Sequence, residues 1–196
     1  MTPPRRGEAD GVPAPRPGTY GPQETGVETS APTRHSDPLS ALEAADHAFT
    51  RSAWTDLTPA AAFELISDVS MIETWSPSAS DVAYEEGGGP WPGSGFGGRN
   101  RGGDREWSSR SQVVESTPGR VFAFVVDDLV RWRWTFRAEG AGTVVEQSWQ
   151  LPRLHPVLGE RREDLDALRD HMAASTERTL VSLARWVGEQ RASRRG

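Results

Sequence analysis

A few polar side chains have the chemistry to act on a carbonyl compound. Arg99, Asn100 and Arg110 lie in segments otherwise poor in charge. Pointing inward, they could donate hydrogen bonds to a ligand carbonyl, or to the oxyanion that develops during an aldol-type ring closure. Pointing outward, they would be solvated on the convex side of a sheet. The outward alternative is favoured for the two arginines, and both alternatives stay open for Asn100.

The ionisable residues offer one further catalytic candidate. His171 could form an acid–base couple with a carboxylate such as Glu73, although a solvated histidine on a helix is the favoured interpretation. Asp127 and Asp128 are adjacent carboxylates, but their place between two predicted strands is typical of a turn. The catalytic residues, if the chain is an enzyme, therefore stay undetermined, with Asn100, Arg110 and His171 as candidates.

Spacing and composition argue against a bound cofactor. The 196 residues include no cysteine, and neither a His-x-Glu nor a His-x-x-x-His spacing occurs, so metal binding is not expected. The glycine runs at 87–89 and 93–98 resemble phosphate loops only in composition, because neither a lysine nor a helix follows them. The sequence predicts no metal and no other cofactor.

The charge and hydropathy of the whole chain limit its partners. A net charge of −6 repels nucleic acid and anionic lipid surfaces. No run of apolar residues approaches the roughly 18 to 20 that a membrane helix needs, and residues 1–10 lack the apolar segment of a secretory signal. We therefore expect a cytoplasmic protein that neither binds nucleic acid nor inserts into membranes. The oligomeric state cannot be predicted.

Apolar residues recur densely only between Ala48 and Val187. Residues 1–46 are rich in proline and glycine and offer little to bury, which predicts a disordered tail. A single domain is expected over residues 47–190, followed by a frayed end at 191–196 with solvated arginines.

The domain is predicted to begin with a strand at 47–56. Thr58 and Pro59 then provide an N-cap and a first-turn proline for a short helix. Ser67 or Asp68 can cap a second short helix, which must end before Pro77.

A meander of strands follows, separated by glycine- and proline-rich turns. Alternating aromatic residues, such as Phe122 with Phe124 and Trp132 with Trp134, are typical of strands in an antiparallel sheet. The predicted strands span residues 80–85, 95–101, 105–116, 120–126, 130–138 and 143–150.

The last predicted element is an amphipathic helix of about eight turns over residues 160–190. Its apolar face includes Leu165, Met172, Thr176 and Leu180. The small residues at 173–175 would leave room for a cavity where the helix crosses the sheet.

The order and spacing of several short motifs resemble the START-like (SRPBCC) superfamily, in particular its polyketide cyclase/dehydrase branch. The resemblance covers about residues 47–190. Together the motifs indicate the fold family more than any one activity. The matching motifs are Thr58-Pro59, Ser67-Asp68, Trp75-Ser76-Pro77, Gly93 to Asn100, Trp107 to Val113, Pro118-Gly119-Arg120, Trp134, Gly142-Thr143, Met172 and Thr179-Leu180.

This resemblance implies an α+β helix-grip fold, in which a curved antiparallel sheet of about six to seven strands wraps a long C-terminal helix. Two short helices follow the first strand. The cavity between sheet and helix would bind an apolar or aromatic small molecule. The ligand-binding residues expected from the resemblance are Trp75, Phe96, Trp107, Phe122, Phe124, Trp132, Trp134, Trp149 and Met172.

Three functions remain open, because a fold alone does not select an activity. The first is binding of a hydrophobic, lipid-like or polyketide-like molecule. The second is a polyketide aromatase/cyclase in which Asn100 and Arg110 orient a reactive chain. The third is a protein-interaction or chaperone-assisting role. The absence of a recognisable histidine–aspartate dyad weakens the second.

Overall fold

The structure is a computed structural model that describes residues 43–102 and 104–195. Residues 1–42, most of the predicted tail, lie outside the described residues. The described part begins with a 3-10 turn, η2 (Ala44–Asp46), and Ala44 packs against the hydrophobic cluster around Trp149. The packed part of the chain thus includes residues before the predicted boundary at 46.

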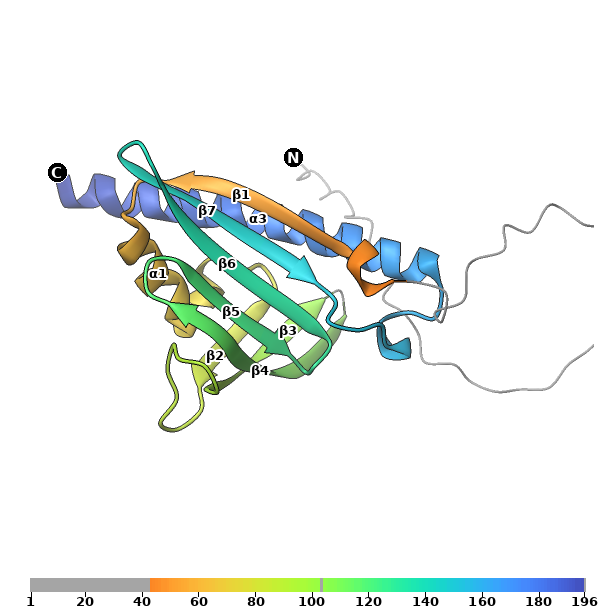
Figure 1. Cartoon of the computed structure of the whole chain (residues 1–196). Helices are drawn as coiled ribbons and strands as arrows, with labels where there is room; N and C mark the ends of the chain where they lie inside the picture. The colour runs from red at the N-terminus through yellow and green to blue at the C-terminus, as the bar shows by residue number, and fades with distance from the viewer. Residues whose placement is uncertain (1–42, 103, 196) are drawn as a thin grey trace, which may run out of the picture.

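Seven strands form one antiparallel sheet in the order β1-β7-β6-β5-β4-β3-β2. Figure 1 shows these strands side by side, with the chain returning along β7 to pair with β1. The prediction of a six- to seven-stranded meander is confirmed. The strands are β1 (Ala48–Thr55), β2 (Ala79–Tyr84), β3 (Gly95–Gly102), β4 (Arg105–Thr117), β5 (Val121–Val126), β6 (Val130–Glu139) and β7 (Gly142–Gln150).

Two short helical units follow β1, as the sequence predicts. In α1 (Pro59–Ser67), the Thr58 hydroxyl accepts the Ala61 N–H at 3.2 Å, which satisfies one of the free donors of the first turn. Asp68 caps the 3-10 turn η3 (Val69–Met71) through the Ser70 N–H. The helix α2 (Ile72–Trp75) then ends before Pro77.

The adjacent residues Asp127 and Asp128 form the turn between β5 and β6, as expected from the sequence. Asp127 and Asp128 have φ angles of 49° and 58°, and the Leu129 N–H bonds to the Val126 carbonyl at 2.9 Å. Three residues, 127–129, connect the paired ends Val126 and Val130, and aspartate tolerates positive φ better than most residues. The Asp127 carboxylate also accepts the backbone N–H of Arg110 at 3.0 Å.

The C-terminal helix α3 (Arg162–Arg195) follows a 3-10 turn, η4 (Pro156–Leu158), and lies along β1 (Figure 1). It is longer than predicted, because residues 191–195 continue the helix instead of fraying. The physical reason lies in Arg191, whose guanidinium pairs with the Asp56 carboxylate at 2.5 Å. This ion pair ties the last turns of α3 to the end of β1.

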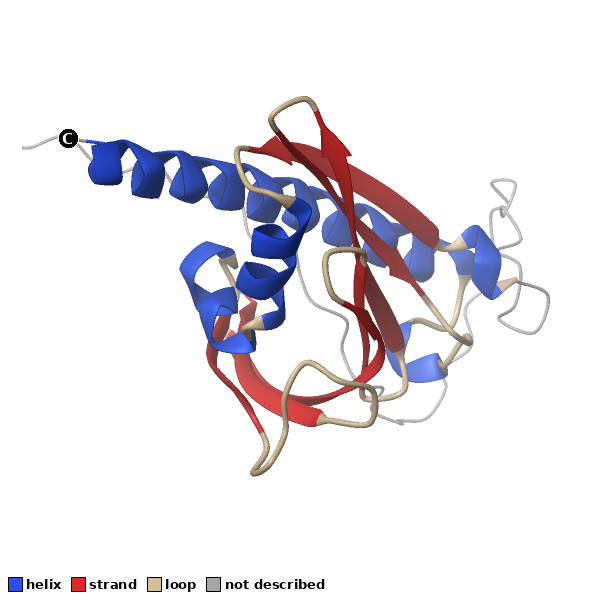
Figure 2. Cartoon of the chain, turned by 60° about the vertical axis from the view of Figure 1, so that its left-hand side comes forward, coloured by secondary structure: helices blue, strands red, loops and turns tan. Residues whose placement is uncertain are grey.

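Figure 2 shows the sheet curving strongly, with α3 crossing its concave side and the short helices near one end. Two hydrophobic clusters fill this arrangement. The larger includes α1, α2 and the central strands, and the smaller is centred on Trp149 and Leu165. This is the helix-grip fold that the sequence predicts. Within residues 43–102 and 104–195, the structure has no helix long and apolar enough to cross a membrane.

Candidate ligand-binding site

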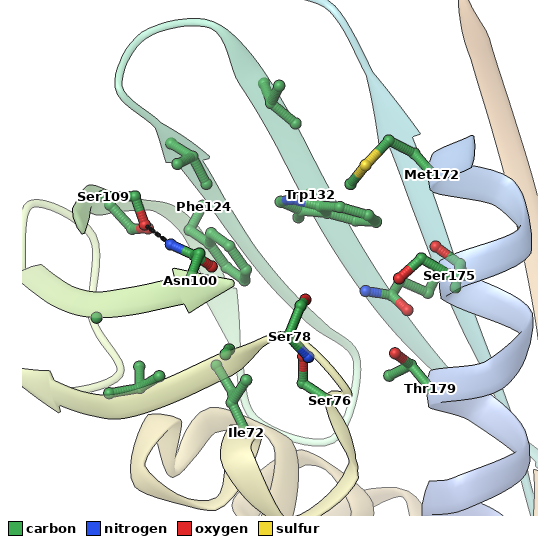
Figure 3. A pocket seen from close by; sticks show the side chains of 18 of the residues that line it. Ile72, Ser76, Ser78, Asn100, Ser109, Phe124, Trp132, Met172, Ser175 and Thr179 are labelled. Atoms are coloured by element: carbon green, nitrogen blue, oxygen red, sulfur yellow. Dashed lines mark hydrogen bonds between the residues drawn. The ribbon is translucent and has the colours of Figure 1, made fainter. Parts of the chain in front are cut away.

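A cavity of about 370 Å³ lies between the concave face of the sheet, α2 and α3. Figure 3 shows side chains from all three parts pointing into it, including Ile72, Phe124 and Ser175. Volumes of about 300 to 1,000 Å³ are usual for small-molecule sites. The prediction that small residues at 173–175 leave room for a cavity agrees with this position, because Ser175 is part of the lining.

Apolar and aromatic side chains form most of the cavity wall. Phe124 and Trp132 are directly paired across β5 and β6, and Phe96 of β3 packs edge-on against Phe124 with ring centroids 5.0 Å apart. Strand alternation places all three rings on the concave face. The apolar lining comprises Ile66, Ile72, Trp75, Ala79, Val82, Phe96, Trp107, Phe124, Val126, Leu129, Val130, Trp132, Trp134, Leu158 and Met172.

The same aromatic face is solid at its other end, under α1. There Phe63 of α1 packs edge-on against both Phe122 and Phe136, at 6.3 and 5.9 Å between centroids. Beside the cavity, α3 instead presents the shorter side chains of Ser175 and Thr179, labelled in Figure 3. The side-chain volume offered by the covering helix therefore decides which part of the concave face stays open.

Asn100 contributes an amide to the cavity wall. Its side-chain N–H donates to the Ser109 hydroxyl at 2.9 Å, the dashed line in Figure 3. Both residues line the cavity. The bond uses one of the two N–H donors of the amide, so Asn100 is held in place while keeping further hydrogen-bonding capacity.

Two buried polar groups in the wall have no hydrogen-bond partner within the described residues. They are Oε1 of Gln147 on β7 and the hydroxyl of Thr176 on α3. Their side chains belong to residues only 7% and 2% exposed. Unpaired polar groups are rare in protein interiors because their desolvation is costly. Neither atom is accessible to a water molecule, so both lie behind the surface of the cavity.

The cavity lining is nearly free of formal charge. Among the described residues that line it, only Asp127 is ionisable in the ordinary pH range, and Asp127 is exposed. No group of three histidine, aspartate or glutamate residues that could hold a metal ion occurs in residues 43–102 and 104–195. The chemistry available in the wall is hydrogen bonding and apolar contact.

Arg110, one of the candidates from the sequence, does not line the cavity. Arg110 is exposed, and it forms a two-pronged ion pair with Glu85 at 2.6 and 2.9 Å, which holds the pKa of the Glu85 carboxyl below its usual value. A Cβ at Gly95 would lie 2.2 Å from this carboxylate, so the glycine makes the close approach possible. Arg99 is likewise exposed and pairs with Asp81. Both arginine side chains are therefore in solvent and outside the cavity, which is the outward alternative described above.

His171 also lies away from the cavity. It is exposed on α3 and does not belong to the lining. Its suggested partner, Glu73, is exposed and accepts the Asp81 N–H at 3.1 Å. The acid–base couple considered from the sequence is therefore not assembled in this structure.

Two of the aromatic residues expected to bind the ligand lie in the packed hydrophobic core and do not line the cavity. Phe122 faces the cavity side of the sheet, but Phe63 covers it. Trp149 stacks on Phe49 with centroids 5.5 Å apart and belongs to the same cluster as Leu165. The candidates that do line the cavity are Trp75, Phe96, Asn100, Trp107, Phe124, Trp132, Trp134 and Met172.

Apart from Asn100, sequence reasoning missed the polar part of the lining. A signal existed for Gln147, which alternates with Val145 and Trp149 on one buried face of β7. A signal also existed for Thr176, a hydroxyl in the middle of the apolar helix face. A polar residue inside an apolar ladder indicates either a buried partner or a ligand. The other polar lining residues are Ser76, Ser78, Ser109, Ser111, Asp127, Ser175 and Thr179.

Comparison with known proteins relates this site to a described family. Residues 46–188 match the family model described as polyketide cyclase/dehydrase and lipid transport. A Polyketide_cyc-like protein from Corynebacterium glutamicum, solved by NMR, shares 27% identity with a TM-score of 0.56. That comparison covers 73% of this chain and 92% of the other. No match was found among curated proteins.

Two more distant structures show the same fold. The di-domain aromatase/cyclase StfQ from the steffimycin biosynthetic pathway shares 18% identity, with a TM-score of 0.58 over 74% of this chain and 52% of that protein. The protein Ms6760 from Mycobacterium smegmatis shares 13% identity, also with a TM-score of 0.58, over 79% of this chain and 98% of the other. At these identities the similarity concerns the fold alone.

Proposed function

Since the chain belongs to the polyketide cyclase/dehydrase and lipid transport family, within the START-like (SRPBCC) superfamily, we propose that it binds a hydrophobic or aromatic small molecule in the cavity under α3. The observation that carries this proposal is an aromatic-walled cavity of about 370 Å³ with a few polar side chains, such as Asn100, in its wall. Burial of the ligand's apolar surface supplies affinity, and the polar groups fix its orientation.

The nearly uncharged wall favours binding over acid–base catalysis. General acid–base chemistry needs a titratable group within hydrogen-bond reach of the substrate. Among the described residues of the lining, the single such candidate is Asp127, whose exposed carboxylate already accepts a backbone hydrogen bond. Trp132 and Met172, which lie side by side in Figure 3, instead offer contacts suited to a flat ring.

A cavity-filling substitution tests the proposal. Ser175→Phe places a benzyl group in the space beside Trp132, and the strain of forcing a ligand into the reduced volume is about 1 to 3 kcal/mol. We expect the affinity for 1-aminoanthracene, a neutral three-ring fluorescent probe, to fall at least about fivefold. The measurement is a fluorescence titration of each purified protein.

Ala174→Phe is the matched control, because Ala174 is adjacent on α3 but exposed. This variant should bind the probe like the wild type. Binding that is equally strong in all three proteins, or undetectable in the wild type, would contradict the cavity as the binding site.

A second candidate function, a polyketide aromatase/cyclase, is favoured by one observation. Asn100 lines the cavity with its amide held by Ser109, which would let it donate to an enolate oxygen during ring closure. If so, Asn100→Ala should reduce turnover of a poly-β-carbonyl mimic by about 100-fold or more. Arg110→Ala, outside the cavity, should not. Turnover insensitive to Asn100→Ala would remove this candidate.

A further inference from the structure

The charge at the edge of the cavity restricts the kind of molecule that the cavity can hold. We propose that the ligand carries a protonated amine, which stays at the opening beside the Asp127 carboxylate while the apolar body of the ligand fills the cavity. This inference rests on the proposed function, and it specifies the ligand class of the same site.

Asp127 lies at the edge of the cavity, in the turn between β5 and β6. Val126, which ends β5, and Val130, which begins β6, both line the cavity. Asp127 itself belongs to the lining and is exposed. A charged ligand group beside it can therefore stay hydrated, which avoids the large cost of burying a charge.

Two hydrogen bonds to one residue hold Asp127 in place. Its backbone N–H donates to the Arg110 carbonyl at 2.9 Å, and its Oδ1 accepts the Arg110 N–H at 3.0 Å. Within residues 43–102 and 104–195, its second oxygen, Oδ2, accepts no hydrogen bond. Because an ionised carboxylate accepts at both oxygens, Asp127 is positioned in advance and can still bind a cation.

No cation of the protein lines the cavity beside this carboxylate, as far as the described residues extend. The Arg110 side chain points to the opposite face of β4, where its guanidinium is paired with Glu85. The neighbouring Asp128 adds a second exposed negative charge, and the net charge of the chain, −6, has the same sign. Coulomb's law therefore favours a cationic group at the opening and disfavours a carboxylate.

The wall next to the turn suits the apolar part of such a ligand. Phe124 lies two residues before Val126 on the same face of β5, and Trp132 is paired with Phe124 across the sheet. An amine with an apolar body can bury that body against these rings and leave its ammonium group in water near Asp127, as lysine side chains do at apolar surfaces.

Three fluorene derivatives test this inference by displacement of 1-aminoanthracene: 2-aminomethylfluorene, a cation at neutral pH, 2-hydroxyfluorene, which is neutral, and fluorene-2-carboxylate. With wild-type protein, the amine should bind at least about fivefold more tightly than the carboxylate, because one charge is attracted and the other repelled. Asp127→Asn keeps the side-chain shape and an oxygen for the Arg110 N–H. It should lower the affinity for the amine, relative to 2-hydroxyfluorene, by about twofold to fivefold.

Asp128→Asn is the matched control, because Asp128 is exposed in the same turn but does not line the cavity. It should change the ratio of amine to hydroxyl affinity much less than Asp127→Asn does. Salt gives an independent readout. Raising the ionic strength from about 0.01 M to about 1 M shortens the screening length from about 30 Å to about 3 Å, so the preference of the wild type for the amine should shrink.

The outcomes separate this inference from the proposed function. Equal binding of the amine and the carboxylate, tighter binding of the carboxylate, or a preference for the amine that is unchanged in Asp127→Asn would overturn the inference alone. Displacement by 2-hydroxyfluorene that is unaffected by Ser175→Phe would overturn the proposed cavity and the inference with it.

Discussion

Two buried threonines with opposite hydrogen-bonding states allow a quantitative test of how the cavity is built. Thr176 is 2% exposed and its hydroxyl has no partner within the described part of the chain. Thr143 is fully buried, and its hydroxyl donates to the Leu57 carbonyl at 2.7 Å. Thr→Val replaces the hydroxyl by a methyl group of similar size at either position. The same substitution should therefore have opposite effects on stability.

The magnitudes follow from the cost of unpaired buried groups. Thr143→Val leaves the Leu57 carbonyl without its donor and should lower the free energy of unfolding by about 1 to 3 kcal/mol. Thr176→Val removes a hydroxyl that is already unpaired, so ligand-free protein should gain about 1 kcal/mol. The two variants should then differ by about 2 kcal/mol or more, which is about 4 to 8 °C in Tm for a domain of this size.

Urea denaturation of ligand-free protein, followed by tryptophan fluorescence, measures both variants under the same conditions. The slope of unfolding free energy against urea should match the wild type, so that the shift in midpoint reports stability alone. A loss of stability in Thr176→Val similar to that in Thr143→Val would show that the Thr176 hydroxyl has a partner in the folded protein.

Two further predictions concern Tyr84 and Trp107. Burial raises the pKa of the Tyr84 phenol well above its usual value of 10.0, so its contribution to stability is full below pH 10 and decreases as the pH rises further. Tyr84→Phe, which removes the bond to the Ser67 carbonyl, should cost about 1 kcal/mol at neutral pH and weaken this alkaline loss in urea titrations at pH 9 to 11. Trp107 is 51% exposed yet lines the cavity. Trp107→Ala should therefore change the free energy of unfolding by no more than about 0.5 kcal/mol. It should also raise the rates at which the ligand associates and dissociates, measured by stopped-flow fluorescence. Unchanged rates would contradict its position at the cavity mouth.

Much of the fold could be predicted because local signals and hydrophobic periodicity agree along the chain. Thr58 with Pro59 starts α1, Asp127 with Asp128 turns the chain between β5 and β6, and alternating rings mark both of those strands. The predicted end of the last helix was wrong. No local signal indicates that Arg191 pairs with Asp56, because Asp56 lies far away in the sequence.

The candidate site could be predicted only in part, because strand alternation identifies a face but not what covers it. Phe122 and Phe124 share the concave face of β5, yet Phe63 covers the first and leaves the second beside the cavity. Arg110 lies between Ser109 and Ser111, which both line the cavity, so it points to the opposite face of β4. There it pairs with Glu85, which directly follows β2. Such contacts between distant residues are set by tertiary packing, so the residue types alone do not reveal them.

The tryptophans provide the most direct test of the central claim, that a small molecule occupies the cavity under α3. Of the eight in the chain, Trp75, Trp107, Trp132 and Trp134 line the cavity, whereas Trp54 and Trp91 are exposed elsewhere. In ¹⁵N–¹H spectra of protein titrated with 2-hydroxyfluorene, we expect the indole signals of the four lining residues to shift most. Shifts confined to Trp54 and Trp91, or no shifts at saturating ligand, would contradict the claim.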